Sequence, residues 1–299
     1  MSLPVAPPSR RSDAGPPPFA KIGIVGLGLI GGSIALAARE RWPSALVIGV
    51  DNKTVIETAI RRHAVDVAAD DIEVLAEADL VILAAPVRQN RALLAELDAH
   101  VRHEAVITDT GSTKRDNIEA AASLPGRFTF IGGHPLGGAA VGGLEHARPD
   151  LFRNRPWLFT PSPDVNAGAL DRLTAFVSAL GSVPTVMSAG EHDRLLAFLS
   201  HVPQLTASAL MQVVGDAVGE GGLALAGRGL ADTTRLSSSP ADIWCDIAAA
   251  NADQVGPALD TLIAVLQSLR SDLANGSRLT EVFAAAARWR EQLASRSTL

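Results

Sequence analysis

A glycine-rich stretch at residues 26–33 most constrains the fold of this 299-residue chain. It follows a short apolar run at 21–25, which predicts a buried parallel strand, and it leads into an alanine-rich segment at 34–39, which predicts a helix. A second apolar run at 46–50 ends at Asp51, twenty residues after Gly31. This order of strand, turn, helix, strand and acid is typical of a dinucleotide-binding βαβ unit.

Each position of the motif has a physical role. Gly26 allows the tight turn, Gly28 lets the backbone approach a pyrophosphate, and Gly31 lets helix and strand pack closely. Asp51 is placed to accept hydrogen bonds from the adenosine ribose and would repel a 2′-phosphate, so the sequence predicts NAD as the cofactor. A glycine-rich structural turn is the alternative. The cofactor contacts expected from the motif are Gly26, Gly28, Leu29, Ile30, Gly31 and Asp51.

The composition indicates a globular protein with a large core. Hydrophobic residues make up 47% and charged residues 19%, and the length suits two domains. A net charge of −6 argues against a nucleic-acid partner. No apolar run approaches the roughly 18 residues that a membrane span needs. The proline-rich segment 1–18 lacks the apolar centre of a secretory signal and is expected to be a disordered arm.

Counts of three residue types narrow the function. The single cysteine, Cys245, permits no intrachain disulfide and no cysteine metal cluster, so we expect a cytoplasmic protein without a metal. The absence of tyrosine excludes the Tyr-x-x-x-Lys proton donor of short-chain dehydrogenases. Lysine occurs only at positions 21, 53 and 114, so a β-hydroxyacid dehydrogenase that needs a lysine in a helical second domain has no candidate.

The hydrophobic pattern predicts two domains after the arm. From 19 to 187 apolar runs alternate with helical segments, which predicts a Rossmann-type doubly wound, mostly parallel α/β sheet. Strands are expected at 21–25, 45–50, 80–84, 105–108, 129–132, 157–160 and 184–187, and helices at 54–64, 89–100 and 167–180. From 188 to 299 the pattern predicts an all-helical substrate domain whose apolar surface suits a homodimer. Pro203 is expected to kink or break its first helix.

Two segments follow strands at the sheet edge where ligands bind in open α/β folds. Ala85, Pro86 and Val87 are expected to lie against the nicotinamide half of the cofactor, with a simple proline turn as the alternative. Asp109 follows the next expected strand, at 105–108, and is expected to be a further cofactor contact. Ser112 is a candidate to bind a substrate hydroxyl or a histidine, but helix mechanics favour a role as the N-cap of the segment that follows.

One histidine stands out by its location. His134 lies between glycines and a proline after the fifth expected strand, on what should be a constrained loop beside the nicotinamide site. This location favours a general base. Apart from His201, the other histidines are weaker candidates, because they lie near predicted helix ends or in polar contexts: His63, His100, His103, His146 and His192.

The helical domain contributes four candidate substrate contacts. His201 and Gln204 are three residues apart and share a helix face, which is either part of the site or a solvated surface. Arg235 lies in a short polar segment and can bind a carboxylate bidentately, although a surface arginine would need no explanation. Trp244 follows nine residues later.

Together these motifs resemble one family. GLGLIGGS at 26–33, DTGSTK at 109–114, GGHPLGG at 132–138, EHDR at 191–194 with SHVP at 200–203, and DTTR at 232–235 occur in one order. This set resembles the prephenate/arogenate dehydrogenases of tyrosine biosynthesis (the TyrA family). The resemblance covers nearly everything from residue 19 to about 250.

The resemblance implies an NAD-dependent oxidative decarboxylation of prephenate to 4-hydroxyphenylpyruvate. It implies that His134 contacts the ring hydroxyl, that Ser112 supports this contact, and that Arg235 binds a substrate carboxylate. Trp244 would lie near the rim of the site.

One residue departs from the family pattern. Many prephenate-specific members read SHLPH, whereas this chain reads SHVPQ, which places Gln204 near the substrate side chain. A neutral amide adds no positive charge there, so an arogenate or dual cyclohexadienyl dehydrogenase remains an alternative. A non-catalytic, NAD-sensing dimeric module is a more remote one.

Overall fold

The computed structural model describes residues 15–138 and 142–296, so most of the expected arm at 1–18 lies outside the described residues. The chain divides into two compact units, residues 1–251 and 252–299. The described helices and strands of the first unit include both the sheet and several helices of the region expected to form the second domain.

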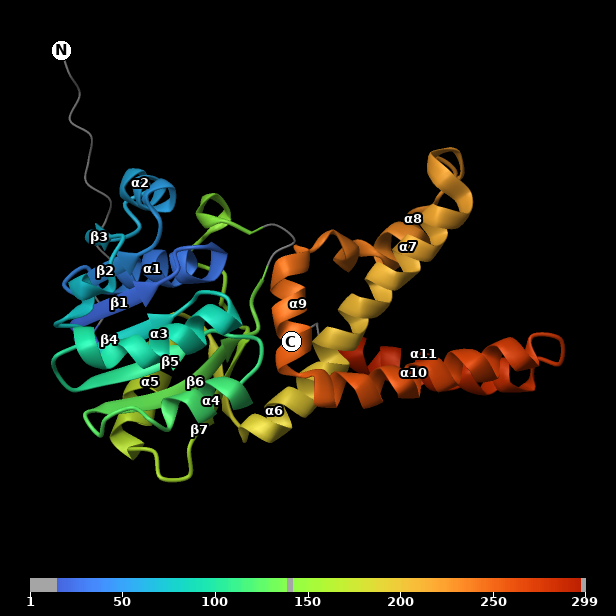
Figure 1. The fold of residues 1–299 in the computed structure, drawn as a ribbon. Coiled ribbons are helices and arrows are strands. Elements are labelled where there is room, and N and C mark those ends of the chain that lie inside the picture. Colours follow the sequence, from blue (N-terminus) through green and yellow to red (C-terminus); the bar gives the residue numbers. More distant parts are fainter. Residues whose placement is uncertain (1–14, 139–141, 297–299) are drawn as a thin grey trace, which may run out of the picture. The chain divides into compact units, whose positions relative to one another are not determined.

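The first unit is built on one sheet of eight strands in the order β3-β2-β1-β4-β5-β6-β7-β8 (Figure 1). All neighbouring strands run parallel except β6 and β7, which are antiparallel, so the expectation of a Rossmann-type, mostly parallel sheet is confirmed. The strands are β1 (Lys21–Val25), β2 (Leu46–Val50), β3 (Val67–Ala69), β4 (Leu80–Leu83), β5 (Ala105–Asp109), β6 (Phe128–Pro135), β7 (Pro156–Pro161) and β8 (Val183–Val186).

Helices cover both faces of the sheet, as buried parallel strands require. Side chains of α1 and α5 belong to the core on one face, and side chains of α3 pack into the core on the other. On the α1 face, the Trp42 and Phe176 rings stack with centroids 5.2 Å apart. The helices between the strands are α1 (Leu29–Arg41), α2 (Lys53–Arg61), α3 (Val87–His100), α4 (Arg115–Ala121) and α5 (Ala167–Ala179), with short 3₁₀ turns η1 (Ile72–Leu75) and η2 (Leu144–His146).

Two strand expectations were incomplete. The three-residue β3 was missed, because its Val-Ala-Ala sequence carries too little apolar pattern to mark a strand. The expected strand at 129–132 extends to Pro135, so His134 lies in β6 and not on a loop. The cause is pairing with β7, which places His134 opposite Leu158 and continues the ladder through a Gly-Gly-His-Pro sequence that resembles a turn.

A run of helices follows β8 within the first unit. It comprises α6 (Ala189–Leu196), the π-helical turn η3 (Ala197–His201), α7 (Val202–Leu223), α8 (Arg228–Thr233), the 3₁₀ turn η4 (Arg235–Ser238) and α9 (Ala241–Ala250). Pro203 lies in the first turn of α7, directly after the π turn. The α-helical hydrogen bonding is therefore interrupted by the π turn before this proline, but the expected break does not occur, since the backbone of His201 and Val202 keeps helical dihedral angles.

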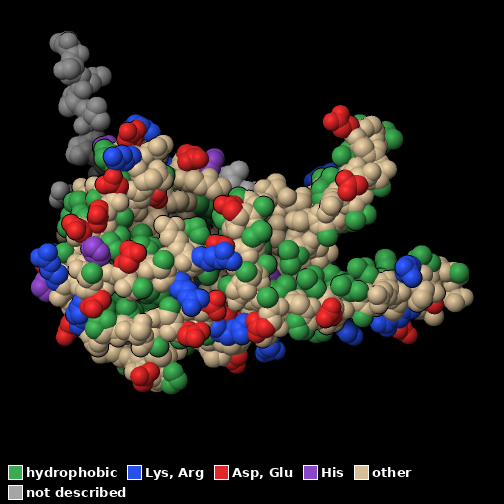
Figure 2. Space-filling view, in the orientation of Figure 1, with side chains coloured by type: hydrophobic (Ala, Val, Ile, Leu, Met, Phe, Trp, Pro, Cys, Tyr) green, Lys and Arg blue, Asp and Glu red, His purple; other side chains and the backbone are tan. Residues whose placement is uncertain are grey.

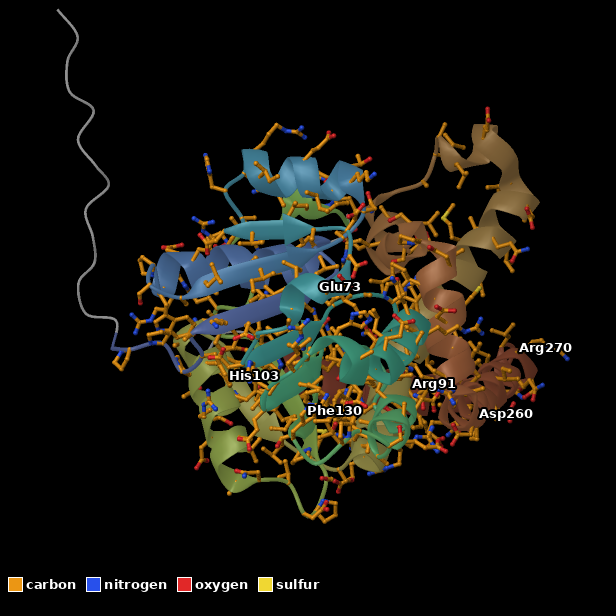
Figure 3. All side chains as sticks on the ribbon, turned by 60° about the vertical axis from the view of Figure 1, so that its left-hand side comes forward. Glu73, Arg91, His103, Phe130, Asp260 and Arg270 are labelled. Carbon is orange, nitrogen blue, oxygen red and sulfur yellow. The ribbon has the colours of Figure 1, made fainter. Side chains whose placement is uncertain are left out.

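The second unit consists of α10 (Ala252–Asp272) and α11 (Ser277–Arg296), which contact each other. Asp260 and Arg270 of α10 are exposed (Figure 3). Large apolar side chains of α11 are also exposed, among them Phe283 at 67% and Trp289 at 62%. Among the residues that the structure describes, no helix combines the length and apolarity needed to cross a bilayer.

Candidate active site

A cleft of about 930 Å³ opens at the carboxyl ends of the central strands. Its lining includes most of the expected cofactor contacts: Gly26, Gly28, Leu29, Ile30 and Asp51 from the glycine-rich unit, and Ala85, Pro86 and Val87 after β4. Ser112 and Trp244 line the same cleft. The carboxyl edge of an open parallel sheet is where ligands bind in this class of fold.

Local sterics explain the glycines of the turn. Gly26 has φ +91°, and a Cβ there would lie 2.7 Å from the carbonyl carbon of Ala84, so only glycine fits. Gly31 does not line the cleft; a Cβ on it would overlap the carbonyl oxygen of Gly26. A Cβ on Gly28 would meet nothing within 4 Å, which leaves open space above the backbone at this point.

The first turn of α1 fits a pyrophosphate. Its N-cap, Gly28, has no side chain to satisfy the free backbone N–H groups, and no acidic residue lies in the first turn. Such a helix N-terminus presents donors and partial positive charge to an anion. Nearby, Asp51 accepts hydrogen bonds from the backbone N–H of Leu27 at 2.6 Å and of Asn52 at 2.7 Å, which fixes its carboxylate at the end of β2.

Asp109 is placed differently from its expected role. It is fully buried and does not line the cleft. Its carboxylate forms a salt bridge with Lys114 and accepts hydrogen bonds from the backbone N–H groups of Gly111 and Gly133, each at 3.0 Å. Lys114 also donates to the Gly133 carbonyl at 2.6 Å. Asp109 therefore joins the end of β5 to β6 beside His134, and the expectation that it contacts the cofactor is corrected.

His134 belongs to a buried polar cluster that the sequence did not reveal. Its Nδ1 lies 2.9 Å from Nε2 of His192, and Nδ1 of His192 lies 2.8 Å from Oδ1 of Asp193. Burial holds the pKa of His134 well below its ordinary value of 6.5, and electrostatic interactions with His192, Lys114 and His201 lower it further. His134 is therefore neutral near pH 7 and can act as a base.

The sequence ranks His192 among the weaker histidines because its neighbours are polar. In the structure His192 is completely buried against His134, so this ranking is wrong. The available signal was local. Ser188 and Glu191 form a capping box that begins α6, which fixes His192 and Asp193 one turn into that helix. The sequence did not show that this turn packs against β6 and α4.

The expected N-cap role of Ser112 is also wrong. Helix α4 begins at Arg115, and no side chain from its own N-cap position bonds to it. Asp193 supplies the cap from 78 residues away, accepting from the backbone N–H groups of Lys114 at 2.8 Å and Arg115 at 3.1 Å, and from Nε of Arg115 at 3.0 Å. Ser112 is consequently left to face the cleft.

His201 lies at the end of the π turn, a geometry that often marks functional sites. It is 1% exposed, and its ring packs edge-on against Trp244 with centroids 6.0 Å apart. Asn251 donates to its Nδ1 at 3.2 Å, whereas its buried Nε2 has no partner among the described residues. Burial lowers the pKa of His201 to about 4. Its neutral ring therefore presents one unused N–H donor.

Gln204 does not line the cleft either. Its Nε2 donates to the carbonyl of Leu236 at 2.7 Å, and its Oε1 accepts from Ser239 at 3.2 Å. The amide thus ties η4 to α7. Arg235, the first residue of η4, is exposed, and no ion pair of its guanidinium occurs within the described ranges. Gln204 therefore positions the turn that carries Arg235.

One surface group could hold a metal ion. Asp71, Glu73 and His100 bring three ligand atoms within 4.8 Å of one another, with Glu73 labelled in Figure 3. These side chains are exposed or half-buried and do not line the cleft. The candidate chemistry rests on the buried, neutral imidazole of His134, the hydroxyl of Ser112 and the guanidinium of Arg235. Of these three residues, Ser112 lines the cleft, whereas His134 and Arg235 are not among its lining residues.

Two family models match the chain in succession. Residues 34–186 match "Prephenate dehydrogenase, nucleotide-binding domain", and residues 188–285 match "Prephenate dehydrogenase, dimerization domain". A prephenate dehydrogenase of Bacillus subtilis is 34% identical over 255 residues, which cover 83% of this chain and 68% of that protein. A cyclohexadienyl dehydrogenase of Zymomonas mobilis is 31% identical over 272 residues, with coverage of 89% and 93%.

Solved structures agree with these relatives. A prephenate dehydrogenase from Aquifex aeolicus, in complex with hydroxyphenyl propionate and NAD⁺, superposes with a TM-score of 0.84 at 26% identity, covering 91% of this chain and 98% of that one. Synechocystis arogenate dehydrogenase gives a TM-score of 0.77 at 29% identity, covering 91% and 99%. With both family models matched and the sequence relatives above 30% identity, the chain belongs to the prephenate dehydrogenase family.

Proposed function

We propose that this protein catalyses the NAD-dependent oxidative decarboxylation of prephenate to 4-hydroxyphenylpyruvate. The observation that carries the proposal is the state of His134: burial keeps its imidazole neutral, its Nδ1 is bonded to His192, and no hydrogen bond engages its Nε2 within the described residues. A neutral imidazole with a free lone pair at a sheet's carboxyl edge is suited to take a proton from an alcohol.

In the proposed reaction, Nε2 of His134 accepts the proton of the ring hydroxyl while that carbon loses hydride. NAD⁺, when bound in the cradle of α1, supplies the hydride acceptor. Loss of the ring carboxylate as CO₂ leaves its bonding electrons in the ring, which becomes aromatic, and His134 returns the proton to the phenolate oxygen. Ser112, which lines the cleft, is proposed to hold the substrate hydroxyl by a hydrogen bond.

Two groups of the helical region are proposed to bind the substrate's anionic side chain. Arg235 offers a guanidinium without an ion-pair partner among the described residues, and such a group can bind a carboxylate bidentately. His201 offers a buried N–H donor that lacks a partner, and a buried donor is costly to leave unpaired. Trp244, in edge contact with His201, lines the cleft and is proposed to bound the site.

Arogenate is the second candidate substrate. Gln204 replaces a histidine of the prephenate-specific pattern, and its amide is neutral at every pH of interest. The similar proteins include a cyclohexadienyl dehydrogenase and an arogenate dehydrogenase. Since the Gln204 amide bonds to Leu236 and Ser239, it adds no charge with which to distinguish a pyruvyl from an alanyl side chain.

We further propose a homodimer formed through the helical region from residue 188 onward, which is also the boundary we retain for a second domain. Residues 188–285 match a dimerization domain. Apolar side chains recur along the surface of α7 and along α10 and α11 (Figure 2). Val213 of α7 is 66% exposed, and Leu225 after it is 88% exposed. Surfaces of this kind on a monomer mark protein–protein contacts.

The test is NADH formation, followed by absorbance, with prephenate and with arogenate in parallel. His134→Asn should lower kcat by about 10²–10⁴-fold, the usual contribution of a positioned base, with little change in KM. The exposed His103, whose side chain bonds to Glu77, provides a matched control in His103→Gln, expected to keep full turnover. No turnover of either substrate by the wild-type protein would refute the proposed function, and full activity in His134→Asn would refute the base.

A further inference from the structure

We propose that Asp193 and His192 form a buried relay that holds the proton of neutral His134 on Nδ1, and that His192 takes this proton while His134 carries the one from the substrate hydroxyl. The proposal deepens the proposed function, on which its second part rests. His192 and Asp193 are positioning residues, because they act on the substrate only through His134.

The relay begins at Asp193, whose carboxylate can only accept hydrogen bonds. It receives the backbone N–H groups of Lys114 and Arg115, the Nε–H of Arg115, and Nδ1 of His192. Burial opposes ionisation, but the hydrogen bonds from His192 and from Arg115 and Lys114 outweigh it and bring the pKa of Asp193 below its ordinary value of 3.8. Asp193 is therefore a carboxylate at neutral pH, and His192 must donate to it from Nδ1.

This assignment fixes the next two nitrogens in turn. Burial lowers the pKa of His192 from 6.5, although Asp193 opposes the shift, so His192 is neutral and carries only its Nδ1 proton. Its Nε2 is then an acceptor. The atom 2.9 Å away, Nδ1 of His134, must be the donor. Neutral His134 is left with a lone pair on Nε2, the form that a general base requires.

The surroundings of the two rings decide where a positive charge is most stable. His134 is packed near Lys114, whose Nζ bonds to the carbonyl of the adjacent Gly133 and whose positive charge disfavours a second charge on His134. His192 also feels the positive charge of Lys114, but it touches Asp193 at 2.8 Å and is attracted by Asp109. A charge on His192 therefore has a direct counter-ion, whereas no carboxylate contacts the ring of His134 among the described residues.

The proton transfers balance. The substrate O–H bond breaks and an Nε2–H bond forms on His134; the Nδ1–H bond of His134 breaks and an Nε2–H bond forms on His192. The positive charge then lies on His192 against the Asp193 carboxylate. Both transfers reverse when His134 returns its proton to the phenolate, so the relay stores the proton only during the reaction.

The first experiment reads the tautomers directly, without substrate. Proton-detected ¹⁵N NMR of the full-length protein with ¹⁵N-labelled histidine should find both rings protonated at Nδ1 and bare at Nε2, with assignments from single His→Gln variants. In Asp193→Asn the new amide can donate to Nδ1 of His192, which reverses every donor along the chain. His134 should then carry its proton on Nε2. A wild-type His134 protonated at Nε2 at neutral pH would overturn the proposal, whatever the enzyme's substrate.

The second experiment separates orientation from proton uptake. In His192→Gln, the side-chain carbonyl can still accept from His134 and the amide can still donate to Asp193, so the tautomer and the α4 cap persist. Glutamine cannot take the proton. We expect kcat to fall about ten- to a hundredfold, the loss typical of a hydrogen bond to a charged group, with KM unchanged. Asp193→Asn should lose about 10²–10⁴-fold, as when the base is removed.

Asp66→Asn is the matched control, since Asp66 also accepts a backbone N–H, from Val47, and pairs with an arginine, Arg39, but lies outside the cluster. It should retain wild-type kcat. Wild-type kcat in His192→Gln would overturn the uptake of the proton by His192. If Asp193→Asn fails to fold, His192→Gln and the wild-type spectrum still decide the question. Absence of prephenate turnover in the wild type would refute the proposed function instead and leave the NMR result standing.

Discussion

The glycine-rich turn allows a prediction that separates fold from cofactor binding. In Gly31→Ala the new Cβ would overlap the Gly26 carbonyl oxygen and lie 3.1 Å from the Ala84 Cβ. The obstacle is backbone, so relief requires α1 to shift away from the turn that it should hold. Overpacking costs about 1–3 kcal/mol, and the upper part of that range, about 2–3 kcal/mol, applies here because the obstacle is backbone. Against this cost the helix gains about 1 kcal/mol from replacing glycine. We expect a net loss of roughly 1–2 kcal/mol.

Thermal unfolding with and without NAD⁺ measures both effects. A loss of this size should lower the Tm of the free Gly31→Ala protein by about 2–8 °C. NAD⁺ at a hundred times its Kd should stabilise the wild type by about 2.7 kcal/mol and raise its Tm, and this rise should be largely lost in Gly31→Ala because the donors at the α1 N-terminus are displaced.

Two glycines serve as matched comparisons. Gly28→Ala places its Cβ in open space, so the free Tm should be unchanged, but the rise with NAD⁺ should shrink because the methyl group occupies the approach of the pyrophosphate. Gly190→Ala, in α6 and also without neighbours within 4 Å, should keep the full rise. A wild-type Tm together with a wild-type NAD⁺ response in Gly31→Ala would refute this account of the turn.

Three further predictions concern specificity and pH. Arg235→Ala should raise KM for prephenate with little change in kcat, by the roughly 1.5–3 kcal/mol typical of hydrogen bonds to a charged group, because Arg235 is exposed; a pure kcat effect in steady-state kinetics would contradict an anion-binding role. Asp51→Asn should shift the ratio of kcat/KM for NAD⁺ over NADP⁺ toward NADP⁺ by at least about tenfold, because the charge that repels a 2′-phosphate is gone; an unchanged ratio would contradict the ribose role. The pKa of His201 is about 4 in the folded protein and 6.5 in the unfolded chain, so between these pH values the unfolded chain binds the extra proton. The free energy of unfolding therefore falls by up to about 3 kcal/mol as the pH drops from 6.5 toward 4. His201→Gln should flatten the fall of Tm with pH, and an identical slope would show that His201 does not contribute.

The sequence predicted what depends on local geometry. The glycine spacing, the acid at the end of β2 and the residues after β4 all reappear around one cleft, because a strand–turn–helix unit defines its own ligand edge. Most strands lie within one or two residues of their expected bounds for a similar reason, since each is a continuous apolar run.

What the sequence did not predict depends on partners distant along the chain. Ser112 has every local property of an N-cap, but Asp193 reaches the same helix terminus from a different element. His192 lies in a polar sequence, EHDR, whose burial arises when α6 packs against α4 and β7 and His192 meets His134 of β6. The position of Asp109 at a strand end predicted a ligand contact, but its carboxylate forms a salt bridge with the buried Lys114 instead. A local sequence pattern does not show which residue from a distant part of the chain will pack against it.

The three uses of Asp193 have a consequence for how this protein can change. The Asp193 carboxylate caps the N-terminus of α4, pairs with Arg115 and orients His192. A substitution at Asp193 therefore alters both the stability of the fold and the chemistry. Improvements in the two properties cannot be sought independently at that position. Substitutions intended to raise stability are better placed on the distant surface of α2 or α5, where a change in folding free energy does not affect the proposed proton transfer.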